Sequence, residues 1–145
     1  MLSFLPRADF VLPDPRYMSL LLGTVSMIPK NGRPIESITS IRLRKKGCLP
    51  GLVGLTTYSM REYRKERTRV PPTCRHVITF YSNLLSRLSD DAVMGVMAHE
   101  LAHAWLNEHV GPEASKQREE DADCLAEMWG FDQQLSALSN ETEPA

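Results

Sequence analysis

The chain has 145 residues, of which 42% are hydrophobic and 24% are charged, and its net charge is −1. These fractions are those of a soluble globular protein with room for one domain and a core of its own. Its three cysteines, Cys48, Cys74 and Cys124, form no C-x-x-C pair. A disulfide framework and a structural zinc ribbon are therefore not indicated.

Three further features predict where the protein works. The first residues lack the charged segment and the long apolar run of a secretory signal. The strongest apolar stretch, Met18–Ile28, is much too short to span a bilayer. Unpaired thiols fit a reducing compartment. We therefore expect a cytoplasmic protein with no membrane span, provided that Met1 is the authentic start.

In chain order, the first half of the sequence predicts an arm followed by a small sheet. Prolines at positions 6, 13 and 15 predict an extended arm over residues 1–16, because proline interrupts a helix. The apolar run from Tyr17 to Ile28 fits either a helix or a strand, since a short apolar run does not decide between them. Alternating and β-branched residues predict strands at 36–44, 52–58 and 77–81, and a short helix follows at 83–88.

A block of positive charge covers the middle of the chain. Residues 42–75 carry ten lysines and arginines against two glutamates, whereas the C-terminal part is acidic. Such a block can attract nucleic acid or an acidic partner, but a charge run is more often a solvated face. Nucleic acid is therefore the weaker interpretation of this block.

The next helix is predicted around an H-E-x-x-H signature, formed by His99, Glu100 and His103. Ser89 is a suitable N-cap, and two aspartates follow it in the first turn, where the helix dipole favours negative charge. On a helix the two histidines lie on one face, within reach of a single ion. A lone histidine is more often a hydrogen-bonded core residue. Two histidines in this register, with a glutamate between them, favour a zinc site.

A third ligand is expected downstream, because catalytic zinc usually takes three protein ligands and leaves the fourth position to water. Residues 115–129 predict a helix that ends at Gly130. Glu119 and Asp123 share a face of this helix with two alanines, which allow close approach to the histidine helix. An acidic cluster alone is more often a solvated helix N-terminus. Beside the histidine pair, we expect Glu119 to bind the metal and Asp123 to accept a hydrogen bond from a ligand histidine, while Glu120 points about 100° away.

These residues resemble the gluzincin metallopeptidases, in which H-E-x-x-H is followed by a glutamate on a second helix. The E-x-x-A-D element of Glu119, Ala122 and Asp123 is similar to that of the HtpX-like and CAAX-prenyl protease group, as are segments 76–85 and 88–91. The histidine stretch with its following Ala-Trp-Leu also resembles the peptidase domain of the plant LIM-domain growth-regulating peptidases. The resemblance covers about residues 51–131.

The predicted elements and this resemblance together imply an α+β fold. We expect a compact zincin-like single domain, in which a small, mostly antiparallel sheet packs on the active-site helix and on the second, glutamate-bearing helix. Residues 1–35 would form an N-terminal arm and the first element, residues 36–138 the metallopeptidase domain, and residues 139–145 a disordered tail.

The implied activity is zinc-dependent hydrolysis of peptide bonds, with one catalytic Zn²⁺ ion and a peptide or protein substrate. The ion, held by His99, His103 and Glu119, acidifies its bound water, and Glu100 is the expected general base. Gluzincins commonly bind substrate as an added strand along a sheet edge. The candidate edge strand comprises Val77, Ile78, Thr79, Phe80 and Tyr81.

Other interpretations stay open at this point. The basic block suggests a DNA-associated zinc peptidase of the SprT kind, and the ligand pattern is shared by regulatory proteases like ImmA/IrrE. A non-enzymatic, zinc-stabilised interaction module would instead close the metal site with a fourth protein ligand, for which Cys124 is the candidate. The residue that stabilises the oxyanion is not decided among His109, Tyr63, Arg118 and His76.

Overall fold

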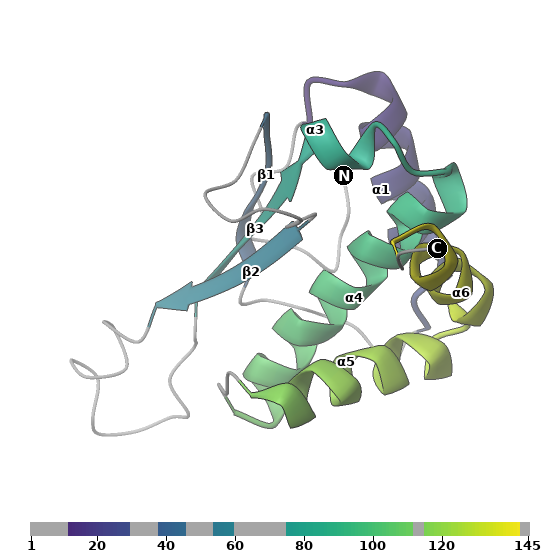
Figure 1. Ribbon diagram of the computed structural model, residues 1–145. Coiled ribbons are helices and arrows are strands. Elements are labelled where there is room, and N and C mark those ends of the chain that lie inside the picture. Colours follow the sequence, from purple (N-terminus) through teal and green to yellow (C-terminus); the bar gives the residue numbers. More distant parts are fainter. Residues whose placement is uncertain (1–11, 30–37, 46–53, 60–74, 112–114, 143–145) are drawn as a thin grey trace.

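A computed structural model describes residues 12–29, 38–45, 54–59, 75–111 and 115–142. The elements in chain order are α1 (Pro15–Met27), β1 (Ile38–Arg44), β2 (Gly54–Ser59), β3 (Arg75–Tyr81), α3 (Ser82–Leu85), α4 (Asp90–His109), α5 (Lys116–Met128) and α6 (Asp132–Thr142). The sheet lies on one side of α4, α1 and α6 lie on the other, and α5 crosses below α4 (Figure 1). The predicted α+β class in a single compact unit is confirmed.

Helix α4 is the element around which the others are packed, since it contacts α1, α5, α6, β2 and β3. It begins where the sequence predicts, because the Ser89 side chain caps the backbone N–H of Ala92. Its core side chains include Met97 and Leu101, both fully buried. At Gly95 an added Cβ would lie 2.6 Å from the carbonyl oxygen of Gln134, so glycine allows α6 to approach closely.

The apolar run from Tyr17 to Ile28, which fits either a helix or a strand by sequence, belongs to helix α1 and its C-cap. The helix begins at Pro15, inside the stretch expected to be an extended arm. The expectation was wrong at this point because proline is well tolerated in the first turn of a helix, where its missing N–H has no partner to lose. Asp14 caps the helix, and Leu21 and Val25 bury one face in the common core. Residues 1–11 of the expected arm lie outside the described residues.

The three strands form a mixed sheet in the order β1-β3-β2. β2 pairs with β3 antiparallel, with Thr56 opposite Ile78. β1 pairs with β3 parallel, with Ile41 opposite Ile78. The expectation of a mostly antiparallel sheet therefore holds for one of the two pairings. A parallel partner separated by a whole intervening strand leaves no local signal in the sequence.

The candidate substrate strand is not an edge strand. Residues 77–81, comprising Val77, Ile78, Thr79, Phe80 and Tyr81, belong to β3, which pairs with β1 on one side and β2 on the other. The edge prediction was therefore wrong. The side chains of this strand are buried on both faces of the sheet: Ile78 and Phe80 are fully buried, and Thr79 and Tyr81 are nearly so. Near-continuous burial of this kind is typical of an interior strand.

The C-terminal helices follow local signals. α5 ends as predicted at Gly130, which has a positive φ of 100°. The N–H of Phe131 donates to the carbonyl of Ala126, and the N–H of Gly130 donates to that of Glu127, which together make a Schellman motif. α6 continues to Thr142, so residues 139–142 of the expected disordered tail are helical.

Candidate functional site

Helix α4 brings the two histidines of the signature together. Because they are four residues apart, His99 and His103 lie on successive turns of one face. Their rings meet edge to face with centroids 4.6 Å apart, and their Nε2 atoms are 3.0 Å apart. Glu100, the residue between them, is 7% exposed. Its Cγ would lie 3.3 Å from a Cβ added at Gly54, which places it beneath the start of β2.

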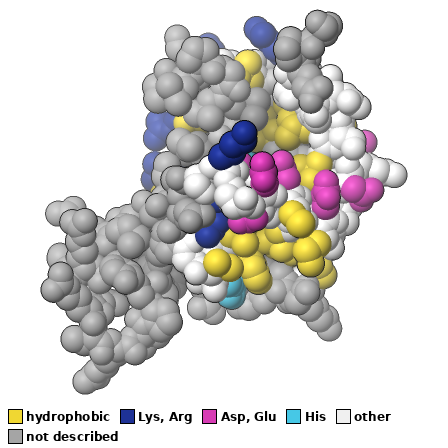
Figure 2. Space-filling view, turned by 60° about the horizontal axis from the view of Figure 1, so that its bottom comes forward, with side chains coloured by type: hydrophobic (Ala, Val, Ile, Leu, Met, Phe, Trp, Pro, Cys, Tyr) yellow, Lys and Arg dark blue, Asp and Glu magenta, His cyan; other side chains and the backbone are white. Residues whose placement is uncertain are grey.

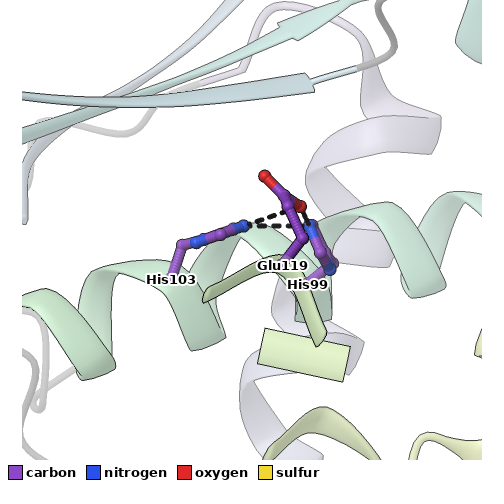
Figure 3. Close-up of side chains that lie close together, drawn as sticks. All are labelled: His99, His103 and Glu119. Atoms are coloured by element: carbon purple, nitrogen blue, oxygen red, sulfur yellow. Dashed lines mark hydrogen bonds and ion pairs between the residues drawn. The ribbon is translucent and has the colours of Figure 1, made fainter. Parts of the chain in front are cut away.

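Helix α5 contributes the carboxylates to the same place. Glu119 Oε2 lies 2.8 Å from His99 Nε2 and 3.1 Å from His103 Nε2, so the three side chains point toward one another from two helices (Figure 3). Ala122 and Ala126 on the packed face of α5 are fully buried. Their small side chains allow α5 to lie close to α4, as the sequence predicted.

Asp123 lies beside the first histidine. Its Oδ1 is 2.7 Å from His99 Nδ1, so the carboxylate can accept the Nδ1 proton and leave Nε2 directed at Glu119 and His103. Glu120 and Cys124 are exposed on other faces of α5. Among the described residues, the group that can hold a metal comprises His99, His103 and Glu119, and Cys124 is not part of it.

The acidic neighbours shift the titration of this cluster. Burial alone lowers the pKa of His99, but the hydrogen bond to Asp123 and the charges of Glu100, Asp123 and Glu119 raise it to about 9. Burial raises the pKa of Glu119, but hydrogen bonds and charges of His103 and His99 outweigh this and lower it. Acidic side chains also gather on the face turned forward in Figure 2. The cluster therefore favours a cation.

The donor set fits zinc. Two imidazole nitrogens only 3.0 Å apart repel each other unless a proton or a cation lies between them. Tetrahedral zinc with bonds of about 2.0–2.1 Å holds its ligand atoms about 3.3 Å apart. Small outward rotations of the three side chains are enough to admit an ion of this size. Two imidazoles and one carboxylate are also a ligand set of catalytic zinc that leaves a fourth position open.

The four candidates for oxyanion stabilisation are placed differently. His76 and Arg118 form hydrogen bonds with Asn107, one turn beyond the histidine pair. His109 stacks on Trp105 at the end of α4, with ring centroids 4.5 Å apart. Tyr63 lies outside the described residues. Asn107, which the sequence analysis did not single out, joins His76 to Arg118.

A comparison with known families finds a match to the C-terminal part of the chain. The model of peptidase family M48 matches residues 73–140, a segment that runs from β3 to α6 and contains His99, Glu100, His103, Glu119 and Asp123. The match supports a peptidase, and it confirms the resemblance to the HtpX-like and CAAX-prenyl protease group. No curated protein and no solved structure matches the chain significantly.

Proposed function

Since residues 73–140 match peptidase family M48, whose members are metallopeptidases, we propose that this protein is a zinc-dependent metalloendopeptidase. The observation that carries the proposal is the convergence of His99 Nε2, His103 Nε2 and Glu119 Oε2, each within 3.1 Å of the other two. Glu119 belongs to the first turn of α5, where the helix dipole also favours its ionised form. Three ligands from two rigid helices suit a catalytic site with one open position.

Each side chain has a distinct role in the proposed reaction. Zinc, when bound, supplies a water acidic enough to act as a nucleophile near neutral pH, and it polarises the substrate carbonyl. Glu100 accepts the proton from that water and passes it to the leaving amine. Its burial beneath β2 supports this role, because the surrounding atoms limit the positions that its side chain can take. Asp123 fixes the ring of His99 by holding its Nδ1 proton.

The substrate class is a peptide or protein. Of the two outer strands of the sheet, β2 is the one that begins at Gly54, directly over Glu100. An extended peptide added beside β2 would form main-chain hydrogen bonds next to the general base. Among the described residues no helix has the length and apolarity needed to cross a membrane. Cytoplasmic location stays a prediction. Nucleic acid stays the weaker interpretation of the basic block, most of which lies outside the described residues.

The test of this function separates metal binding from catalysis. Glu100→Gln removes the proton acceptor without changing a ligand, so the purified variant is expected to retain the zinc content of the parent by mass spectrometry. Its hydrolysis of a fluorogenic peptide library is expected to fall at least about 100-fold. Glu120→Gln makes the same chemical change at an exposed position of α5 and is expected to retain both properties.

Two results would count against the proposal. Cleavage by Glu100→Gln at the rate of the parent means that Glu100 is not the general base. A parent protein that binds zinc but cleaves no member of the library contradicts endopeptidase activity. In that case the site is structural or serves another reaction.

A further inference from the structure

Three polar side chains from three elements are buried together one turn beyond the metal cluster. His76 of β3 is fully buried, Asn107 of α4 is 4% exposed, and Arg118 of α5 is 5% exposed. Asn107 follows His103 by four residues, so it continues the histidine face of α4. Burial of a polar or charged group is costly unless hydrogen bonds compensate for the loss of water. We call these three residues the buried network.

The hydrogen bonds of the buried network run in one direction. Arg118 Nη1 donates to Asn107 Oδ1 at 3.1 Å, and Asn107 Nδ2 donates to His76 Nε2 at 3.1 Å. Burial lowers the pKa of His76 to about 4. The ring is therefore neutral near pH 7, and its Nε2 can accept. The same Arg118 atom also donates to the carbonyl oxygen of Gly111 at 2.8 Å.

The position of Arg118 opposes the electrostatic preference of its own helix. It lies in the first turn of α5, just after the N-cap Ser115, where the helix dipole disfavours a cation. The carbonyl of Gly111, however, lies just beyond the C-terminus of α4, where a cation is favoured. The guanidinium thus binds the end of α4 to the beginning of α5. The residue that follows it in the chain is Glu119.

Apart from the contacts of Glu119 and Asp123 with the histidines, whose geometry is the feature to be explained, the contact between α4 and α5 gives little directional information. On α5 it includes Ala122 and Ala126, and small apolar side chains allow one helix to slide or rotate against another. Hydrogen bonds of a buried polar group have a required direction and can fix register. We propose that Arg118 and Asn107 are positioning residues, which fix the first turn of α5 on α4 and thereby direct Glu119 at the two histidines. This inference rests on the proposed function in treating Glu119 as a ligand.

The experiment compares two cations on the same helix. Arg118→Met removes the guanidinium and retains an unbranched side chain, whereas Lys116→Met removes an exposed cation two residues earlier. In zinc-free protein, we expect the amides of α5 in Arg118→Met to exchange hydrogen at least about 10-fold faster, because hydrogen bonds from a charged donor are lost. In a chelator competition assay, zinc affinity is expected to fall about 10–100-fold. Lys116→Met is expected to behave as the parent in both assays.

A second, milder variant tests the same inference if Arg118→Met does not fold. Arg118→Lys keeps the charge and one donor group on a shorter side chain, and its zinc affinity is expected to lie between those of the parent and Arg118→Met. Unchanged exchange in α5 overturns the inference. So does unchanged zinc affinity at a temperature at which the variant is folded, even if its melting temperature is lower. A parent that binds no zinc contradicts the proposed function instead, and the exchange assay then decides alone whether Arg118 holds α5.

Discussion

Successive turns of one face of α4 support two polar regions of opposite character. In the metal cluster, the side chains of Glu119 and Asp123 are 61% and 58% exposed, and the pKa of His99 is raised to about 9. In the buried network every side chain is at most 5% exposed, and the pKa of His76 is lowered to about 4. Nearby carboxylates stabilise the charged imidazole in the first region, and desolvation disfavours it in the second. The first region therefore suits a cation, and the second suits a fixed contact between elements.

The largest expected effect that tests this comparison is loss of zinc from the metal cluster. Glu119→Ala removes the carboxylate that lies within 3.1 Å of both histidines, and we expect it to abolish catalytic zinc binding. Because Glu119 is exposed and supplies only one of the charges that stabilise protonated His99, the zinc-free variant should unfold at a temperature only slightly below that of the zinc-free parent. Zinc titration and thermal denaturation with chelator measure the two effects.

The matched control is the neighbouring carboxylate. Glu120→Ala changes a residue that points about 100° away along the helix, and it should leave zinc affinity nearly unchanged. A large loss of affinity confined to Glu120→Ala would overturn the assignment of Glu119. His99→Ala or His103→Ala should likewise release the metal, and each should remove the stabilisation that zinc gives to the native state.

The grouping of the cluster could be predicted from sequence because it depends on short-range helix geometry. The spacings from His99 to His103 and from Glu119 to Asp123 each place two side chains on one helix face. Once two such faces meet, four side chains converge whatever the details of the fold. Their roles as ligands and orienting residue stay predictions. Ser89 and Gly130 were equally predictable, since a helix cap involves only a few adjacent residues.

The parts that sequence reasoning did not predict depend on contacts between distant elements. β3 was expected to be an edge strand because gluzincins commonly bind substrate along a sheet edge. Its parallel partner β1 lies more than thirty residues earlier, so the sequence gives no local signal of this pairing. The buried network joins β3, α4 and α5, so its composition depends on how all three are packed. One signal was present in the sequence: Arg118 occupies a first helical turn, where a cation is unfavourable. Such a residue deserves a tertiary explanation.

The two histidines should affect stability in separate pH windows in zinc-free protein. The pKa of His76 is about 4 in the folded protein, below the ordinary value of 6.5 for histidine. The unfolded chain therefore takes up the proton first, and the free energy of unfolding falls as pH drops from 6.5 to 4. The full effect is roughly 3 kcal/mol. The pKa of His99 is raised to about 9, so its contribution is complete below pH 6.5 and is lost as pH rises through 9.

Urea denaturation in the presence of chelator measures both windows. His76→Gln should remove the contribution of this residue to the fall in the free energy of unfolding at acid pH. His99→Gln should likewise remove the contribution of His99 to the fall at alkaline pH. High salt should reduce the His99 effect, because two of its three carboxylate neighbours, Asp123 and Glu119, are exposed, and it should leave the His76 effect nearly unchanged. If the free energy of unfolding depends on acid pH in the same way in His76→Gln and in the parent, burial does not lower the pKa of His76.

The smallest of the expected effects concerns the charge of Asp123. Asp123→Asn keeps an oxygen that can accept the Nδ1 proton of His99 but removes the negative charge, and we expect zinc affinity to fall about 10–100-fold. Asp121→Asn is the matched control, because Asp121 accepts a hydrogen bond from Gln117 on the same helix rather than from a histidine. Its zinc affinity should equal that of the parent. In the buried network a neutral amide, Asn107, is enough to orient an imidazole. If Asp123→Asn also binds zinc as tightly as the parent, orientation alone is sufficient in the metal cluster as well, and the charge of this carboxylate does not distinguish the two regions.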